Sequence, residues 1–317
     1  MKKLKFVAKI IGIIALFIVS VICIFGIIHN ILLKIENKKI VPNGILTEVN
    51  GHKLHIYSEG DINNKPILVF MSGSGTPAPV YDFKQLYTLF SDEYCIAVIE
   101  KIGYGYADIA NTDRDIDIIL EESRAALQSN GFIGHYVLFP HSFSGLEALY
   151  WLSKYPEEIT AIIGLDMAFP ECYKYLKKPS KSQFAYVSII TKLGLQRLPF
   201  MFQYKLDNIY FTEEEFRQAN YLAYRNGLNI SVRNESKSVF DNANKVNNSN
   251  YLEKINNVLL FSSNGKQIGD YWLSVQKEFS QKIDVELIIL DCGHYIHHYE
   301  SPKIAEESKI YLSKILE

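Results

Sequence analysis

The chain has 317 residues, of which 48% are hydrophobic and 21% charged, and its formal net charge at pH 7 is −2. A chain of this length can bury a large core, and these apolar and charged fractions are those of a globular protein. The charge provides no basic surface of the kind that nucleic acid needs, so we expect no nucleic-acid partner.

The amino-terminal segment, residues 1–35, differs in composition from the rest. Four lysines precede an uncharged run that extends from Ile10 to Ile28. This run is close to the ~20 residues that an apolar helix needs to cross a bilayer. No A-x-A-like cleavage site follows it, which favours an uncleaved transmembrane anchor and the start of a linker over a secretory signal.

The lysines around this run also bear on orientation. Four lysines lie before it, and Lys34, Lys38 and Lys39 follow it. Positive charge is retained on the cytoplasmic side of a membrane, so the slight excess favours an amino terminus inside the cell. We therefore expect a single-pass protein of the cell membrane with its large domain on the extracellular side.

Predicted strands alternate with predicted helices along residues 44–168, the expected first half of a core domain. Two strand-like runs flank Asn50-Gly51, a dipeptide typical of a β-hairpin. The alternation favours an α/β fold with a mostly parallel sheet and helices on both faces. The predicted strands are 45–49, 53–57, 67–71, 94–100, 136–140 and 161–165, and the predicted helices are 81–90, 113–129 and 146–155.

The pattern changes between residues 169 and 250, where no clear strand is found. Thr212 followed by Glu213, Glu214 and Glu215 is typical of a capping box at the start of a helix. We interpret 169–250 as a helical cap, and 251–317 as the second half of the core. The aromatic residues of the cap include Phe184, Tyr186, Phe200, Phe202, Tyr210, Phe211, Phe216, Tyr221 and Tyr224.

In the second half of the core, strands are predicted at 258–262 and 285–290. A helix is predicted at 270–279, and Ser301-Pro302 opens the last helix with proline at its tolerated first position.

Ser142 lies in a predicted tight turn between a buried strand and a helix. A serine in this setting is a candidate nucleophile, and it requires a base, a group that orients the base, and donors for the oxyanion. The turn, Pro140-His141-Ser142-Phe143-Ser144-Gly145, resembles the G-x-S-x-G nucleophile elbow of the α/β-hydrolase superfamily. Pro140 and Ser144 occupy two positions that are usually small.

Three further motifs resemble this superfamily in the same chain order. Ser72-Gly73-Ser74-Gly75 occupies the position of its His-Gly oxyanion loop. Glu100-Lys101-Ile102-Gly103-Tyr104-Gly105 is similar to its Asp-Arg-x-Gly-x-Gly stretch, and Gly293-His294 with Glu300-Ser301-Pro302 is similar to its terminal motif. The resemblance covers residues 45–317 without the cap. It implies the α/β-hydrolase fold. Into this fold we place the helical cap indicated by residues 169–250, and before it the transmembrane helix indicated by the apolar run.

The resemblance also implies roles for individual residues. Ser142 would attack a carbonyl group, and His294 would accept the serine proton and return it to the leaving group. The backbone N–H groups of Phe143 and Ser74 would hold the oxyanion. These four residues form the candidate catalytic site together with an acid.

Two acids could orient His294. Asp166 follows the predicted strand 161–165, a position that part of the superfamily uses. Asp270 is the first carboxylate after the predicted strand 258–262, which many members follow with their acid. Both preserve the chain order Ser, Asp, His. We favour Asp166 and keep Asp270 as the alternative.

Neither a metal nor a cofactor is expected. The histidines at 294, 297 and 298 have no further ligands at zinc spacing. Gly103-Tyr104-Gly105 lacks the third glycine of a dinucleotide fingerprint, and no Walker sequence is present.

The expected activity is that of a membrane-anchored serine hydrolase. Its substrate would be a small-molecule carboxylic ester, thioester or amide with an apolar portion, because the cap is rich in aromatic residues. One alternative is a prolyl-iminopeptidase-like aminopeptidase, which would need Glu213, Glu214 and Glu215 turned toward the site. Another is a non-catalytic binding protein with the same fold. Dehalogenase chemistry is disfavoured because that branch has Asp at the position of Ser142.

Overall fold

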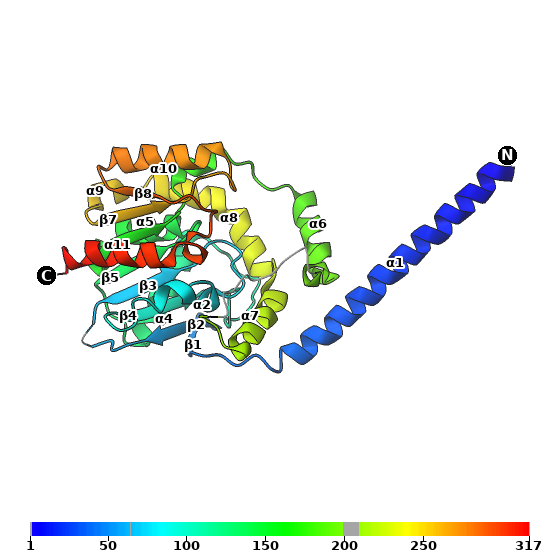
Figure 1. Cartoon of the computed structure of the whole chain (residues 1–317), viewed down its shortest axis with the longest axis horizontal. Coiled ribbons are helices and arrows are strands. Elements are labelled where there is room, and N and C mark those ends of the chain that lie inside the picture. The colour runs from blue at the N-terminus through cyan, green and yellow to red at the C-terminus, as the bar shows by residue number, and fades with distance from the viewer. Residues whose placement is uncertain (1, 64, 199–208, 317) are drawn as a thin grey trace.

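The computed structural model describes residues 2–63, 65–198 and 209–316. A sheet of eight strands lies at the centre of the globular part, in the order β1-β2-β4-β3-β5-β6-β7-β8 (Figure 1). The pairs β1–β2 and β2–β4 are antiparallel and the other pairs are parallel. The strands are β1 (Ile45–Val49), β2 (His52–Glu59), β3 (Ile67–Met71), β4 (Cys95–Glu100), β5 (Tyr136–Pro140), β6 (Ile159–Leu165), β7 (Val258–Ser262) and β8 (Leu287–Ile289).

The central strands are mostly apolar because helices cover both faces of the sheet. Every residue of β3, β4, β5 and β7 is buried. Such strands read as continuous apolar runs rather than as alternating ones. At the edge, Asn50 and Gly51 adopt φ values of 54° and 78°, which a type I′ hairpin turn requires. The predicted mostly parallel sheet and the predicted hairpin are both confirmed.

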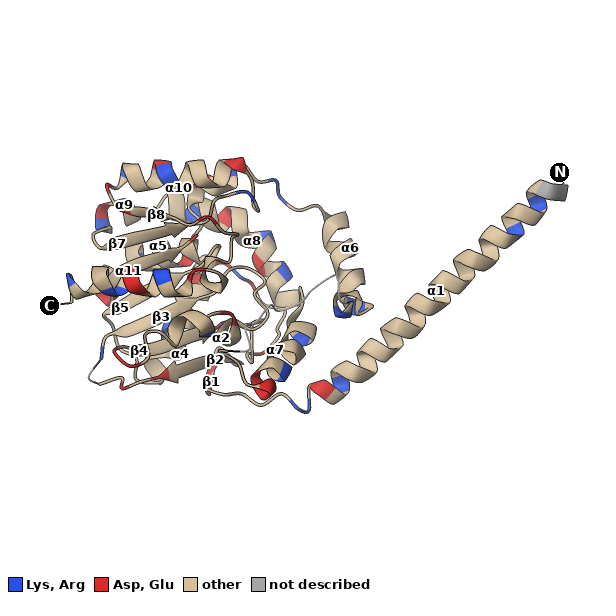
Figure 2. Ribbon diagram, in the orientation of Figure 1, with Lys and Arg blue, Asp and Glu red and all other residues tan. Residues whose placement is uncertain are grey.

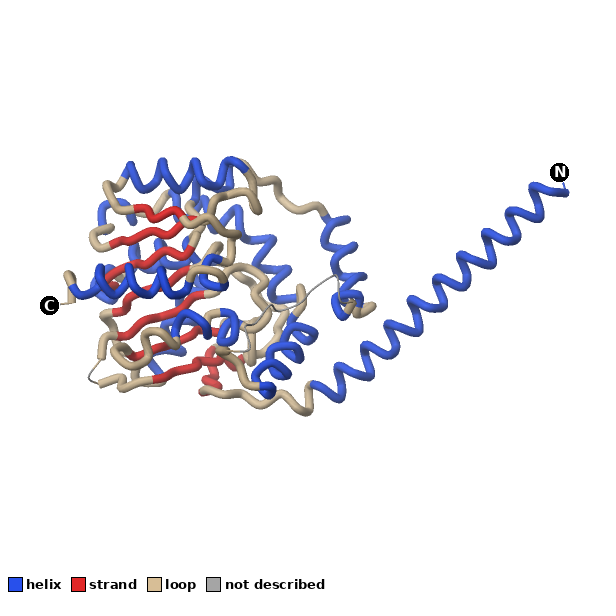
Figure 3. The backbone as a smooth tube through the Cα atoms, viewed as in Figure 1, coloured by secondary structure: helices blue, strands red, loops and turns tan. Residues whose placement is uncertain are grey.

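Helices lie on both sides of the sheet (Figure 3). One apolar cluster joins the sheet to α4, α5 and α10, and a second joins its other face to α2, α3 and α11. The helix predicted at 81–90 is instead two single turns, and it starts earlier because Pro79 occupies a first-turn position. The helices of the core are α2 (Pro79–Asp82), α3 (Lys84–Tyr87), α4 (Ile116–Ser129), α5 (Ser144–Lys154), η1 (Pro156–Glu158), α9 (Tyr251–Lys254), α10 (Asp270–Lys282), η4 (Ile296–His298) and α11 (Ser301–Ser313).

The segment between β6 and β7, residues 169–250, is called the cap segment below. Its described residues are helical or irregular, and Thr212 and Glu215 form the predicted capping box at the start of α7. Phe200 and Phe202 lie outside the described residues. The elements of the segment are η2 (Pro170–Lys174), α6 (Lys181–Lys192), η3 (Leu195–Arg197), α7 (Glu213–Asn226) and α8 (Ile230–Asn247).

Helix α1 (Lys2–Glu36) projects away from the globular part (Figure 1). The most apolar 18-residue stretch of this helix has a mean hydropathy of 3.1, and almost all of its side chains are exposed. Charged residues lie toward its two ends and are missing from its middle (Figure 2). Its length and composition suffice to cross a bilayer, although a signal sequence can share both properties.

Candidate active site

Ser142 lies in a sharp turn between β5 and α5. Its φ of 52° falls in the left-handed region, which non-glycine residues adopt only where the surroundings enforce it. Here the backbone N–H of Ala168 donates to the Ser142 carbonyl over 2.7 Å. Pro140 is the last residue of β5, where a missing N–H costs no interior ladder bond. The unusual proline therefore fits the end of this strand.

The turn is closely packed against its neighbours. A Cβ atom on Gly145 would lie 2.4 Å from the Ala168 carbonyl oxygen, so this position needs glycine. A Cβ atom on Gly73 would lie 2.8 Å from the Cβ atom of Ser142. Ser144 is tolerated in a usually small position because its hydroxyl donates to the Met71 carbonyl over 2.7 Å. The loop after β3 and the loop after β6 thus lie against the serine turn.

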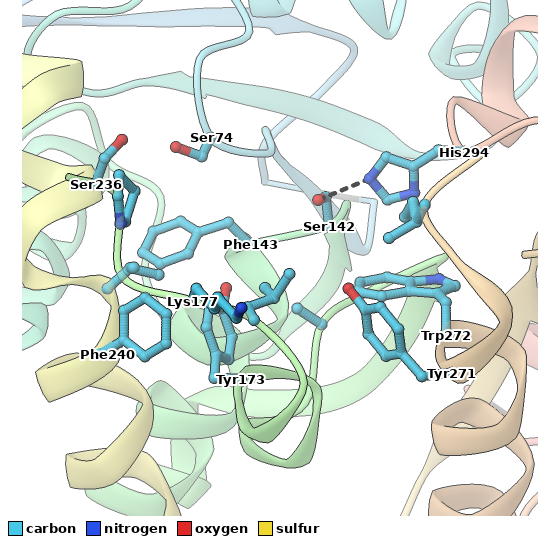
Figure 4. A pocket seen from close by; sticks show the side chains of 15 residues that line it. Ser74, Ser142, Phe143, Tyr173, Lys177, Ser236, Phe240, Tyr271, Trp272 and His294 are labelled. Atoms are coloured by element: carbon cyan, nitrogen blue, oxygen red, sulfur yellow. Dashed lines mark hydrogen bonds between the residues drawn. The ribbon is translucent and has the colours of Figure 1, made fainter. Parts of the chain in front are cut away.

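The structure places His294 between Ser142 and Asp166. Its Nε2 atom lies 2.8 Å from the Ser142 Oγ atom (Figure 4). Its Nδ1 atom lies 2.7 Å from Asp166 Oδ2. The backbone N–H of His294 also donates to Gln267 Oε1 over 2.8 Å, which fixes the loop that bears the imidazole. A neutral imidazole in this place can accept the serine proton while Nδ1 donates to the carboxylate.

Asp166 is fully buried and holds its carboxylate in one orientation. Its Oδ1 atom accepts the Ser263 backbone N–H at 2.9 Å and the Trp272 indole N–H at 2.8 Å. These bonds leave Oδ2 for His294. Asp270, the alternative acid, is exposed at the first residue of α10. The geometry therefore brings Asp166, and not Asp270, to the imidazole.

Trp272 was not among the residues that the sequence suggested for the site. A buried indole N–H needs an acceptor, and Trp272 lies on a helix that the sequence does predict. The sequence could therefore predict that the Trp272 indole N–H has a polar partner, but not which residue it is. The partner is Asp166, more than a hundred positions earlier in the chain.

The two candidate oxyanion donors come from the residue after Ser142 and from the loop after β3. Phe143 immediately precedes α5, where the first N–H groups of a helix have no partner within the helix. In the loop after β3, the Gly75 N–H donates to the Tyr104 hydroxyl over 3.0 Å. Among the described residues the Ser74 N–H has no such partner, and Ser74 lines the same cavity as Ser142. Both N–H groups are thus available to a ligand.

A buried charged cluster lies under these donors. Tyr104 donates to Glu235 on α8 over 2.5 Å, and Lys101 forms ion pairs with Glu235 and with Glu147 on α5. Burial lowers the pKa of Lys101, but the two carboxylates outweigh it and the pKa is raised. Burial also raises the pKa of Glu147. The cluster joins the loop after β3, helix α5, which follows Ser142, and the cap segment.

A second polar cluster supports the loop that carries His294. Asp82 on α2 accepts from the Nε2 atoms of His297 and His298, each over 2.9 Å. Burial lowers the pKa of His297 to about 4. Burial also lowers the pKa of His298, but Asp82 outweighs it and the net shift is upward. His141 is buried nearby, and burial lowers its pKa well below the usual range.

This cluster predicts that acid destabilises the fold. A histidine that is buried with a lowered pKa takes up protons on unfolding, so its contribution to stability is full above pH 6.5 and falls toward pH 4. His298 has a raised pKa in the folded protein, so its protonation increases the free energy of unfolding as the pH falls through that pKa. This contribution arises at a higher pH than the loss from His297. We expect His297 alone to lower the free energy of unfolding by about 2 kcal/mol between about pH 7 and pH 5. Denaturant titrations at both pH values, on wild type and on His297→Gln, measure this loss.

In His297→Gln the amide can still donate to Asp82, but it does not titrate. The pH-dependent loss should therefore shrink by about the same amount, 2 kcal/mol. An unchanged loss in the variant would contradict the assignment to His297.

Asp82, His297 and His298 are also the described residues that could hold a metal ion. Their ligand atoms lie within 4.8 Å of one another. The spacing of the histidines alone gave no indication of such a group, because Asp82 comes from a different part of the chain. The hydrogen bonds described above already pair these atoms with one another.

A cavity of about 390 Å³ opens beside Ser142 and His294. Its walls come from the serine turn, from α10 and from the cap segment (Figure 4). Most of the lining is apolar or aromatic, and Lys177 is the one lysine or arginine among the lining residues. The lining side chains labelled in Figure 4 include Phe143, Tyr173, Lys177, Phe240, Tyr271 and Trp272.

No protein-family model matches the sequence. The chain is 36% identical over 222 residues to YbdG of Bacillus subtilis, described as an uncharacterized protein. The match covers 68% of each of the two chains. This identity over two thirds of the chain places both proteins in one family.

Several solved structures are similar to this chain. Epoxide hydrolase VrEH1 from Vigna radiata has a TM-score of 0.63 at 16% identity, and the match covers 85% of this chain and 97% of the epoxide hydrolase. A carboxylesterase structure from the Thaumarchaeon Nitrososphaera gargenis has a TM-score of 0.60 at 14% identity, and the match covers 86% of this chain and 98% of that one. The enol-lactonase from Burkholderia xenovorans LB400 has a TM-score of 0.57 at 15% identity, and the match covers 85% of this chain and 100% of the lactonase. The chain therefore has the fold of these hydrolases and belongs to the same family as YbdG of Bacillus subtilis.

Proposed function

We propose that this protein is a membrane-anchored serine hydrolase that cleaves a carboxylic ester of a small molecule with an apolar portion. The observation that carries the proposal is the position of His294, within hydrogen-bond distance of both Ser142 and Asp166. A serine hydroxyl is a weak nucleophile unless a base removes its proton. The hydrolase fold and the hydrolases among its structural neighbours support this assignment.

The reaction follows from these positions. The Ser142 oxygen attacks the ester carbonyl while His294 Nε2 accepts its proton, and Asp166 stabilises the imidazolium that forms. The N–H groups of Phe143 and Ser74 donate to the oxyanion. The imidazolium then gives its proton to the leaving alcohol. Water, deprotonated by His294, releases the acid and restores Ser142.

The cavity supports an ester with an apolar portion. Its lining of Phe143, Tyr173, Phe240 and Trp272 can cover a hydrocarbon group and exclude water from it. Helix α1, inserted through residues 10–28, would hold the domain at a bilayer, and the lysine distribution favours the extracellular side.

The three acids proposed for an aminopeptidase do not line the cavity. Glu213 and Glu214 are exposed and pair with Arg217. Glu215 bonds to Lys84 and to its own helix cap at Thr212. Carboxylates held in this way are not placed to bind the amino group of a substrate at Ser142, so we favour an ester over an amino-terminal peptide.

Turnover of model substrates tests this function. The full chain in detergent would be assayed with p-nitrophenyl acetate, butyrate, octanoate and laurate, and with proline p-nitroanilide. We expect ester hydrolysis with a larger kcat/KM for the longer acyl chains, and about tenfold or more lower turnover of the anilide. Faster cleavage of the anilide would favour the aminopeptidase. No turnover of any compound by folded protein would favour a non-catalytic binding protein.

Tyr104 is expected to position an oxyanion donor. Its hydroxyl accepts the Gly75 N–H and donates to Glu235, so it orients the peptide that follows Ser74. Removing the hydroxyl in Tyr104→Phe frees this loop, and we expect kcat to fall about tenfold with little change in KM. Steady-state kinetics with a butyrate ester measure both quantities.

Tyr106→Phe is the matched control, because its hydroxyl bonds to Tyr81 instead. Its kcat should remain within about twofold of wild type. Equal losses in the two variants would mean that the effect of Tyr104 is a general loss of packing.

A further inference from the structure

Helix α1 contacts the cap segment where its uncharged run ends. A Cβ atom on Gly26 would lie 3.1 Å from the Leu193 side chain, and Gly194, at a φ of 75°, leaves no room for a side chain against His29. Arg197 donates to His29 Nδ1 over 2.7 Å and forms a partly buried ion pair with Glu36. The end of α6 and the turn after it therefore lie at the level where α1 would leave the bilayer.

The cap segment near this contact has an unusual surface. Residues 172–192 contain five lysines and no acidic residue. Tyr175, Leu176, Tyr186 and Ile189 expose 57%, 43%, 67% and 56% of their surfaces. Aromatic and aliphatic side chains flanked by lysines are the composition of protein surfaces that bind at the headgroup level of membranes.

Helix α6 carries two of these apolar groups, Tyr186 and Ile189, on a side that the core does not cover. Ser188, on its other side, accepts from Arg233 of α8 over 2.7 Å. Tyr186 and Ile189 lie three positions apart and share the exposed side. Helix α6 lies on the side of the globular part from which α1 projects (Figure 1). An apolar face that α8 does not cover is thus turned outward beside α1.

The same stretch of chain forms one wall of the active-site cavity. Tyr173, Leu176, Lys177 and Pro179 line the cavity that contains Ser142. Leu176 belongs both to this wall and to the exposed apolar group. The cavity and the outward apolar surface are therefore continuous along residues 173–179.

We propose that residues 174–192 rest on the surface of the bilayer that α1 enters, and that the active site receives its ester substrate from that bilayer. The occupant of this surface is the lipid itself, with the lysines at anionic headgroups and Tyr186 and Ile189 among the acyl chains. The substrate is then an amphiphilic ester whose hydrocarbon chain dissolves in the membrane. This second statement rests on the proposed function, whereas contact with lipid does not.

Quenching by brominated lipids tests the contact. The full chain, carrying Tyr186→Trp, would be reconstituted in nanodiscs of phosphatidylcholine and phosphatidylglycerol with brominated acyl chains. Ile133→Trp is the matched control, because Ile133 is 75% exposed in the turn before β5, away from the cap segment. Trp151 and Trp272 are buried and give the same background in both variants. We expect the fluorescence of Tyr186→Trp to fall about twofold relative to the control. Equal quenching in both variants would overturn the proposal.

Kinetics test the delivery of substrate. Tyr186 and Ile189 do not line the cavity, so Tyr186→Ser/Ile189→Ser should leave hydrolysis of soluble p-nitrophenyl butyrate unchanged. For monooleoylglycerol in the nanodisc, we expect kcat/KM to fall about tenfold. An unchanged rate with the oleoyl ester would overturn delivery from the bilayer. Absence of turnover with both esters in wild type would refute the proposed function, while the quenching result would still decide whether the cap segment contacts lipid.

Discussion

Ser142→Ala should reduce ester hydrolysis by about 10⁴-fold or more, because the covalent route through an acyl-enzyme is lost. The substitution removes one hydroxyl that bonds to His294 and leaves the backbone turn with its N–H donors in place. The small remaining rate would come from those donors and from substrate binding. Initial rates with p-nitrophenyl butyrate, at enzyme concentrations high enough to detect residual turnover, measure the loss.

Ser236→Ala is the matched control for this experiment. Ser236 lines the same cavity, but its hydroxyl donates to the Val232 carbonyl within α8. Its turnover should stay within about threefold of wild type, since no role in the reaction depends on it. Retention of full activity in Ser142→Ala would show that the hydrolysis comes from another group or from a contaminant.

Asp166→Asn is expected to lower kcat by about 10³- to 10⁴-fold. The asparagine oxygen can still accept from Ser263 and Trp272, so the side chain keeps its place. Its amide group then faces His294 Nδ1 as a donor, which forces the proton of the neutral imidazole onto Nε2. In that tautomer His294 cannot accept the serine proton. Steady-state kinetics and a thermal melt of the same preparation separate this effect from unfolding.

Asp270→Asn provides the comparison, because Asp270 is the alternative acid, the first carboxylate after the strand 258–262. It is exposed at the start of α10, and its replacement should change kcat by less than about twofold. A large loss in Asp270→Asn with a small one in Asp166→Asn would reverse the assignment of the acid.

The sheet could be predicted from the sequence because its central strands are buried on both faces. Runs such as 67–71 and 136–140 contain no charged residue, and no helical or alternating pattern competes with this interpretation. The two turns at 79–87 were predicted as one helix instead. Short helices of this kind are decided by packing and by Pro79, and periodicity over ten residues does not resolve them.

The candidate site was predictable where residues follow predicted strands. Ser142, Asp166 and His294 each come after a strand of the parallel sheet, and the carboxyl ends of such strands meet at one edge. The choice between Asp166 and Asp270 depended on the distance from each carboxylate to the imidazole, which the sequence does not give. The same holds for Asp82 beneath His297 and for Glu235 beneath Tyr104, since the partners are far apart in the chain.

The central claim is that Ser142 is an activated nucleophile, and covalent labelling tests it most directly. The full chain in detergent would be treated with a fluorophosphonate probe, digested, and analysed by peptide mass spectrometry. We expect one phosphonylated peptide, with the adduct on Ser142, and loss of labelling in Ser142→Ala and in His294→Ala. A folded wild-type protein that remains unlabelled, or an adduct on a different residue, would contradict the account.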